Sequence, residues 1–168
     1  MDSAPFIICA TGHRPNKLFG YNLYVPEYAN IAKNIRTILV GEITKHKNVL
    51  CVCGGALGID QLFGLVVVKL KENFSNVYLE LAIPCRDYTK MWKDTKYYDI
   101  LLTKCDIKTV VNDEPYKPKH MQLRNIYMVD KSDMVIAVYD GYSSGGTKNC
   151  IDYAKNKHKH IVFVNPYK

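Results

Sequence analysis

Two glycine-rich segments have the residue types and the spacing to bind a phosphate. "GGALGID" (54–60) follows the apolar run 49–53, and "DGYSSGGT" (140–147) closes the apolar run that starts at 134. Each precedes a predicted helix, and the free backbone N–H groups of a helix N-terminus bind anions without a side chain. Glycine lets a ligand come close to the backbone there. The two turns together predict a phosphate-bearing ligand such as a nucleotide, and the alternative is tight turns with close helix–strand packing.

Polar residues near these turns are candidates for contacts with such a ligand. "TGHRP" (11–15) follows the first apolar run, where Arg14 could pair with a phosphate or hold a loop, and His13 more often serves as a loop hydrogen-bonder than as a catalyst. Asp60 could cap the helix that begins there or accept hydrogen bonds from ribose hydroxyls. In "QLRN" (122–125), Arg124 and Asn125 could reach a ligand or a partner subunit, or tie helix to loop.

Apolar runs alternate with amphipathic segments along the whole chain. We predict strands at 5–11, 49–53, 77–83, 107–111, 134–140 and 160–164, and helices at 26–47, from the glycines to about 74, and at 88–104, 119–132 and 145–157. This alternation predicts one α/β domain over residues 1–168, a doubly wound and mostly parallel sheet with helices on both faces. Ligands of such sheets bind beyond the carboxyl ends of the strands, where both glycine turns fall.

Composition and charge narrow the function classes. With 48% hydrophobic and 23% charged residues the chain is globular, and its net charge of +7 favours a phosphate-bearing or polyanionic partner. No apolar run is long enough to cross a bilayer, so we expect no membrane partner. Six cysteines without a C-x-x-C pair and without a signal peptide predict a reduced, cytoplasmic protein whose cysteines act as small hydrophobic residues. We expect no metal site and no required cofactor beyond a nucleotide-type ligand.

The motifs "TGHRPNKLFGY", "CGGALGIDQ", "QLRN", "MVDKSDMVIAVYDG" and "GGT…DYA" occur in this order between residues 6 and 164. Together they resemble the SLOG superfamily and, within it, the YspA/YpsA-like group of bacterial and phage proteins. The resemblance implies a Rossmann-like fold, a pocket for a nucleotide or an NAD- or ADP-ribose-derived molecule, and a possible homo-oligomer. The implied ligand-binding residues are Thr11, Gly12, His13, Arg14, Gly54, Gly55, Ala56, Gly58, Asp60, Arg124, Asn125, Asp140, Gly141, Gly145, Gly146 and Thr147.

Relatives within the superfamily suggest two alternatives. Lonely Guy hydrolases carry a catalytic glutamate in "GGxGTxxE", but that position is Cys150 here. Asp152 lies two residues later, about 200° around a helix, and would face away. A nucleotide N-glycosidase or phosphoribohydrolase would therefore need another acid, Asp60 or Glu114. Tyr88 also stands where YpsA-like proteins are expected to have glutamine.

DprA proteins share a similar first turn and bind single-stranded DNA. The lysines here are scattered over predicted helices, which makes nucleic acid the least favoured partner without excluding it. The expected function is thus a nucleotide sensor or sequestering protein rather than an enzyme. The abundance of lysine, asparagine and tyrosine suggests an AT-rich genome such as that of a phage or a low-GC bacterium.

Overall fold

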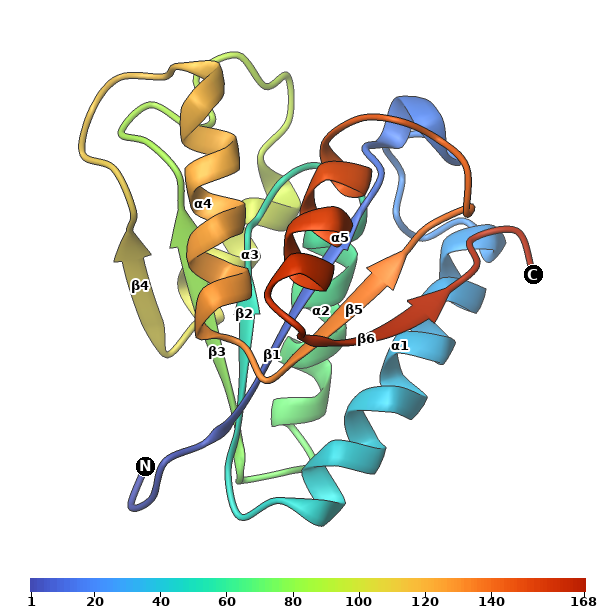
Figure 1. Ribbon diagram of the computed structural model, residues 1–168, viewed down its shortest axis with the longest axis vertical. Helices are drawn as coiled ribbons and strands as arrows, with labels where there is room; N and C mark the ends of the chain where they lie inside the picture. The colour runs from blue at the N-terminus through green and yellow to red at the C-terminus, as the bar shows by residue number, and fades with distance from the viewer.

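The computed structural model describes all 168 residues and contains one six-stranded sheet with helices on both of its faces (Figure 1). The strands are β1 (Phe6–Gly12), β2 (Val49–Cys53), β3 (Val77–Ile83), β4 (Ile107–Val110), β5 (Met134–Val138) and β6 (His160–Val164). The helices are α1 (Pro26–Lys45), α2 (Ile59–Lys71), α3 (Lys96–Lys104), α4 (Pro118–Lys131) and α5 (Gly146–Asn156), with a short 3-10 turn, η1, at Pro15–Lys17.

The strand order is β4-β3-β2-β1-β5-β6, and every neighbouring pair is parallel. The chain winds outward from β1 to β4, crosses back over the sheet through α4, and continues on the other side of β1 with β5 and β6. The predicted doubly wound parallel sheet is therefore confirmed. Because the winding direction reverses between β1 and β5, the loops after these two strands diverge and leave a crevice at the carboxyl edge.

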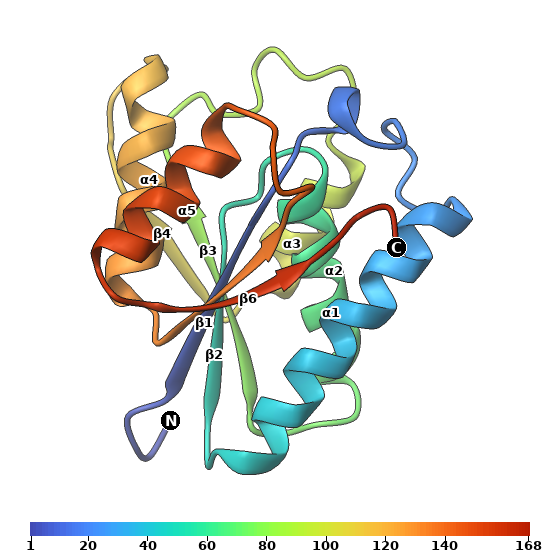
Figure 2. The same ribbon diagram turned by 45° about the vertical axis from the view of Figure 1, so that its right-hand side comes forward.

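The two faces of the sheet have cores of different size. Helices α1, α2 and α3 cover one face over a cluster of 30 buried residues, and α4 and α5 cover the other over a cluster of nine (Figures 1 and 2). Strand β1 serves both faces, since Ile8 and Ala10 belong to the larger cluster and Cys9 to the smaller one. The α4–α5 layer thus rests on much less buried apolar surface.

Helix α1 is formed as the sequence predicts. Pro26 stands in its first turn, where the missing N–H costs nothing, and a buried stripe repeats every three or four residues. The residues of the stripe are Tyr28, Ile31, Ile35, Leu39 and Ile43. No helix of the structure combines the length and the apolarity needed to cross a membrane.

The predicted helix at 88–104 is wrong in its first half, because α3 begins only at Lys96. Residues 86–91 form turns, after which Asp94 Oδ1 accepts the Lys96 N–H at 2.9 Å and the helix starts. Tyr88 and Trp92, four residues apart, imitate a helical stripe in the sequence. In the fold their rings meet edge to face with centroids 4.9 Å apart, and Tyr88 is buried.

The cysteines behave as small apolar residues. Five of the six are buried and all are free thiols. Cys51 and Cys53 belong to the larger core cluster and Cys9 to the smaller one, which confirms the structural interpretation of these positions.

Candidate functional site

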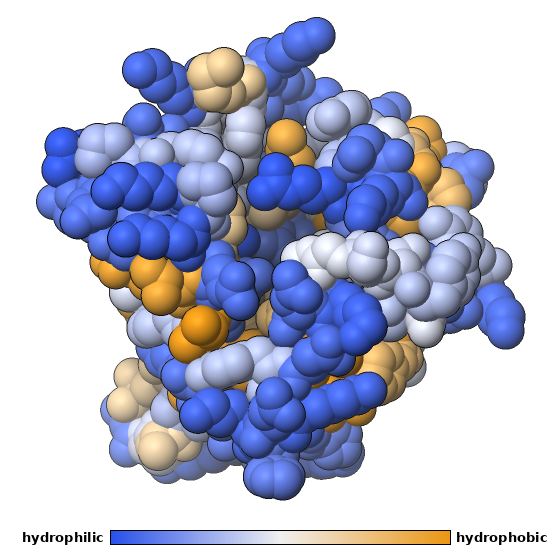
Figure 3. All heavy atoms as spheres, turned by 45° about the horizontal axis from the view of Figure 1, so that its top comes forward, coloured by the Kyte–Doolittle hydropathy of each residue, from blue (hydrophilic) through white to orange (hydrophobic).

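A cavity of about 250 Å³ lies at the crevice between the carboxyl ends of β1 and β5. Seen from this edge, the surface is mainly hydrophilic and is hollowed near its middle (Figure 3). The lining comes from the β1–η1 segment, the start of α2, helix α4 and the start of α5. Ten of the residues predicted from the sequence take part: Thr11, Gly12, His13, Arg14, Ala56, Asp60, Arg124, Asn125, Gly146 and Thr147.

Two cations border the cavity at its outer side. Arg14 is exposed and its guanidinium forms no ion pair or hydrogen bond within the protein, so it is available to a ligand. Lys17 donates from Nζ to the Ser144 carbonyl at 3.1 Å, which holds the ammonium beside the loop that leads into α5. Lys17 and its neighbour Asn16 were not predicted from the sequence, although both directly follow the "TGHRP" motif in the same loop.

The second glycine turn is open toward the cavity. A Cβ built on Gly146 would meet no atom within 4 Å, and one on Gly145 would meet only Lys17 Nζ, at 3.2 Å. Gly146 and Thr147 form the first turn of α5 and line the cavity. The first N–H groups of a helix have no intrahelical acceptor, and the helix dipole places partial positive charge there. This turn therefore has both the space and the polarity to receive an anion.

The first glycine turn is different, and the expectation that it approaches a ligand needs correction. Gly54, Gly55 and Gly58 do not line the cavity, because protein atoms fill the space where their side chains would be. A Cβ on Gly55 would lie 2.8 Å from the Tyr98 ring, and one on Gly58 would lie 2.7 Å from the His13 carbonyl. Both residues also have φ in the left-handed region, at +73° and +94°. The alternative interpretation, tight turns and close packing, applies to these three glycines.

Gly54 makes room for a buried arginine. A Cβ there would lie 2.6 Å from both Arg124 Nη1 and Asp60 Oδ2. Arg124 Nη1 donates to the Gly54 carbonyl and, at 3.3 Å, to the Tyr88 hydroxyl, while Nη2 lies 3.8 Å from Asp60 Oδ2. Arg124 is 3% exposed, so its guanidinium ties α4 to the end of β2 rather than extending freely toward a ligand.

Asp60 lies on the inner wall of the cavity and is almost fully buried. Burial raises its pKa, and the Arg124 guanidinium and the Ala56 N–H, which donates to Oδ2 at 3.3 Å, oppose that rise. Its carboxylate is thus already engaged by protein groups. Glu114, the other acid considered for catalysis, is not part of the lining; it lies in the β4–α4 loop beside Lys117 and His120.

His13 lines the cavity with an unused ring nitrogen. The side chain is buried, and Nε2 has no hydrogen-bond partner; the Asp140 carboxylate is 3.8 Å away. Burial lowers the pKa of His13 and outweighs the opposite effect of Asp140, so the ring is neutral at pH 7. Asp140 itself accepts the N–H groups of Tyr142 and Ser143 and shapes the β5–α5 loop. Asp140 and its neighbour Gly141 stand outside the cavity lining.

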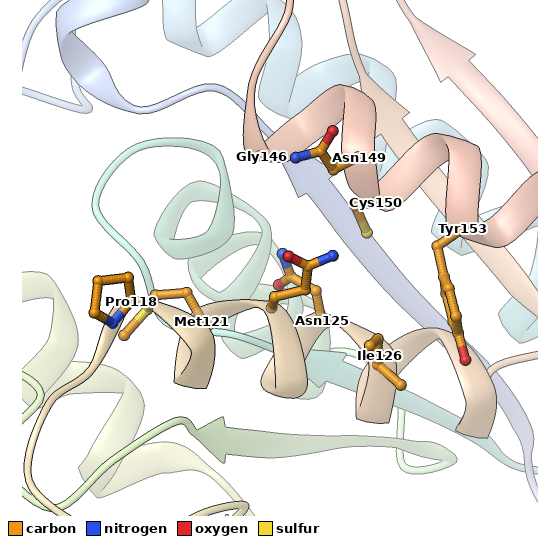
Figure 4. Close-up of a pocket in the computed structure, with 9 residues that line it drawn as sticks. Pro118, Met121, Asn125, Ile126, Gly146, Asn149, Cys150 and Tyr153 are labelled. Atoms are coloured by element: carbon orange, nitrogen blue, oxygen red, sulfur yellow. The ribbon is translucent and has the colours of Figure 1, made fainter.

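A second hollow of about 180 Å³ lies between α4 and α5 and shares Met121, Asn125 and Gly146 with the cavity (Figure 4). Cys150, at the position of the hydrolase glutamate, points its sulfur into this hollow. Burial raises the pKa of that thiol to about 11, although the Thr11 hydroxyl acts against the rise, so the thiol stays protonated at neutral pH. Asp152 pairs with Lys148 at 2.6 Å and does not line the hollow, as expected from its place on the helix.

The other residues of this hollow were missed by the sequence analysis. They are Pro118, Met121, Gln122, Ile126, Asn149 and Tyr153. The only signal in the sequence is their spacing of three or four residues along two helices, and an ordinary core stripe has the same spacing.

The model of the YspA SLOG family matches residues 8–167. The SPbeta prophage-derived protein YoqJ of Bacillus subtilis is 34% identical over 143 residues, which cover 77% of this chain and 83% of YoqJ. A UPF0398 protein of Bacillus thuringiensis is 25% identical over 154 residues, covering 90% of this chain and 83% of the relative.

Among solved structures, the fold is similar to that of DNA processing protein A from Helicobacter pylori, a structure described for its single-stranded DNA binding mode. The TM-score is 0.62 at 17% sequence identity, and the match covers 96% of this chain. The chain spans 66% of the length of that protein. At this identity the likeness concerns the fold.

Proposed function

This chain belongs to the YspA SLOG family, and on that premise we propose that it binds a nucleotide or a related phosphate-bearing small molecule, as a sensor or a sequestering protein. The observation that carries the proposal is the open first turn of α5. There Gly146 and Thr147 line a cavity that also receives Arg14 and Lys17. The phosphate site lies at this second glycine turn alone.

Several physical features favour a phosphate over other anions at this place. Oriented N–H groups and the helix dipole suit a compact charge with several acceptor oxygens. Arg14 offers a planar fork and Lys17 a compact ammonium, and the two differ in how they engage phosphate oxygens. Neutral His13 adds a buried nitrogen that can donate to such an oxygen or accept from a ligand hydroxyl.

The site lacks a carboxyl group that is free for catalysis, which favours binding of the ligand without chemical change. Glycosidic cleavage at a nucleotide needs a carboxyl group free to donate a proton or to stabilise the developing charge. Asp60 is the one carboxylate in the lining, and it is held by Arg124 and by the Ala56 N–H. Cys150 stands where the related hydrolases have their glutamate, and its protonated thiol cannot take that part.

The test is calorimetric titration of the protein with AMP, ADP-ribose, NAD and inorganic phosphate, with analysis of the recovered ligand for hydrolysis. Gly146→Val places a side chain in the shared part of the cavity without a clash. We expect it to abolish binding while leaving the melting temperature nearly unchanged. Gly41→Val, in α1 and also without neighbours within 4 Å, serves as the control for a new valine in a helix.

If none of these compounds binds the wild-type protein at millimolar concentration, the proposal fails. Recovery of a free base together with a ribose phosphate would replace it by the hydrolase alternative, with Asp60 as the first residue to substitute. Gly55→Val is not a suitable blocking variant, because its side chain would strike Tyr98 and damage the fold.

Single-stranded nucleic acid is a second candidate, supported by an observation that the sequence did not reveal. Four exposed tyrosines, Tyr21, Tyr24, Tyr116 and Tyr142, lie in loops that follow strands, at the same edge of the sheet as the cavity. Exposed aromatic rings near basic residues can stack on unpaired bases. This alternative predicts that fluorescently labelled oligo(dT) binds with strong salt dependence, and that Tyr24→Ala weakens it whereas Gly146→Val does not.

A further inference from the structure

We propose that the hollow between α4 and α5 is the subsite for the base of the nucleotide, so that the ligand lies with its phosphate at Arg14 and Lys17 and its base against Asn149 and Tyr153. This inference rests on the proposed function, since it assigns the orientation of the ligand within the same site. Nothing in the resemblance or in the relatives assigns a role to this hollow.

Charged residues line one part of the site and are absent from the other. The cavity at the β1–η1 segment carries Arg14, Lys17, Arg124 and Asp60, whereas no residue that is charged at neutral pH lines the hollow. Its two titratable groups, the Cys150 thiol and the Tyr153 hydroxyl, both have raised pKa values and stay protonated at neutral pH. A dianionic phosphate therefore has partners only at one end, and the other end accepts the neutral part of the ligand.

The cavity and the hollow are continuous with each other. Met121, Asn125 and Gly146 line both the cavity and the hollow, so one molecule can occupy the two spaces together. The volumes, about 250 and about 180 Å³, together fall in the lower part of the range of ~300–1,000 Å³ found for small-molecule sites. Gly146, in the first turn of α5, lines both spaces, so a sugar can pass beside it into the hollow while the phosphate stays at the N–H groups of that turn.

The walls of the hollow carry side chains that can hydrogen-bond to a ligand. Asn125 Oδ1 accepts from Arg124 Nε at 2.9 Å, which leaves the Asn125 amide nitrogen as a donor. Asn149 lines the hollow from α5, and Gln122 lies one turn before Asn125 on α4; neither carboxamide forms a hydrogen bond within the protein. A carboxamide presents a donor beside an acceptor, which matches the edge of a nucleobase such as adenine.

Tyr153 gives the hollow a flat apolar surface of fixed orientation. The Tyr153 hydroxyl donates to Asp130 Oδ1 at 2.6 Å and points away from the hollow, which leaves the ring as the contacting surface (Figure 4). Ile126 and Met121 form the facing wall on α4. Aromatic and thioether side chains of this kind pack favourably on a planar base.

The experiment compares AMP with ribose 5-phosphate, which keeps the sugar and phosphate but lacks the base, by titration calorimetry. For the wild type we expect AMP to bind more tightly. Asn149→Ala should weaken AMP about fivefold, the effect of one lost neutral hydrogen bond, and leave ribose 5-phosphate unchanged. Asn149→Trp should fill the hollow and weaken AMP by more than tenfold, again sparing ribose 5-phosphate. Asn149 is exposed, so both variants should keep the wild-type melting temperature.

Two sets of controls complete the design. Asn156→Ala removes a carboxamide from the far end of the same helix, outside the hollow, and should change neither ligand. Lys17→Gln should weaken both ligands by a similar factor, whereas Lys33→Gln, an equal change of charge on α1, should weaken neither.

Equal loss of AMP and ribose 5-phosphate in Asn149→Trp, or unchanged AMP binding in that variant, would overturn the base subsite while leaving the proposed function intact. Equal affinities of the wild type for the two ligands would overturn it as well. Failure of both AMP and ribose 5-phosphate to bind the wild type would overturn the base subsite, and it would remove the proposed function as well if ADP-ribose, NAD and inorganic phosphate also failed to bind.

Discussion

Replacing Glu80 by glutamine should lower the stability of the fold by about 2 kcal/mol, although this residue lies outside the candidate site. Glu80 projects from β3 toward α4 and has no exposed surface. It accepts hydrogen bonds from Thr109 Oγ1 at 2.6 Å, the Tyr127 hydroxyl at 2.7 Å and Lys131 Nζ at 2.8 Å. The carboxylate thereby joins β3, β4 and α4.

The magnitude follows from these three contacts. Removing one partner of a fully buried ion pair costs about 3–5 kcal/mol. Lys131 keeps 31% of its side chain exposed and can regain water, which reduces the expected loss to about 2 kcal/mol. For a protein of this size such a loss lowers the melting temperature by roughly 6 °C. Glu72→Gln, which breaks an exposed ion pair with Lys69, is the control and should cost less than about 0.5 kcal/mol.

The same two variants also test how the stabilisation by Glu80 depends on pH. Burial alone would raise the pKa of Glu80, but the bonds from Lys131, Thr109 and Tyr127 outweigh it, so the pKa in the folded state is lowered. The stabilisation from a carboxylate with a lowered pKa is fully present above its unfolded pKa of about 4.3 and disappears as the pH falls through the folded value.

Circular dichroism melts of the wild type, Glu80→Gln and Glu72→Gln at pH values from 7 down to 3 would measure this effect. The difference in stability between wild type and Glu80→Gln should be constant between pH 7 and 5 and should decrease below pH 4. A Glu80→Gln variant within 0.5 kcal/mol of wild type at pH 7, or a gap that does not change down to pH 3, would refute the reasoning.

Two further predictions concern glycine and cysteine. Gly54→Ala should destabilise the protein by about 3 kcal/mol, because its methyl group displaces Arg124 and Asp60. Gly41→Ala, which has open space around it in α1, should stabilise the protein by about 0.5–1 kcal/mol. Urea denaturation of the two variants measures both changes in the free energy of unfolding. Cys150 should react with iodoacetamide at pH 7.5 at least tenfold more slowly in the native protein than in urea, since burial raises its pKa to about 11. Mass spectrometry would follow the labelling, and fast labelling of Cys150 in the native protein would contradict this buried environment.

The sequence predicts the order of the elements well because each strand and most helices carry their own local pattern. The near-continuous apolar runs of β2 and β5 predict buried strands from local residues alone. The regular apolar stripe of α1 predicts the buried face of a helix in the same way. The first half of the helix expected at 88–104 fails because Tyr88 and Trp92 are spaced as on a helix, while the turns that bring their rings together depend on tertiary contacts.

The candidate site is predictable only in part, and its two glycine turns explain why. A glycine in the sequence indicates that something lies close to the backbone, but not whether this is a ligand or the protein itself. At Gly54 and Gly55 the neighbours are Arg124 and Tyr98, whereas at Gly146 the space is empty. The role of Arg124 is equally hidden in the sequence. A guanidinium that donates to a carbonyl 70 residues away cannot be told there from one that donates to a phosphate, and only its burial in the fold shows which it is.

The unequal cores of the two faces have a consequence for how occupancy of the site would be communicated. Helices α4 and α5 are held to the sheet by nine buried apolar residues, against 30 on the opposite face, so their amide protons should exchange with solvent earlier than those of α1 and α2. A molecule bound between α4 and α5 would contact both helices and hold them together, so the amide protons of these two helices should exchange more slowly when it is bound. Under the proposed function, binding would then be detectable as slower amide exchange in α4 and α5, with no change of shape required.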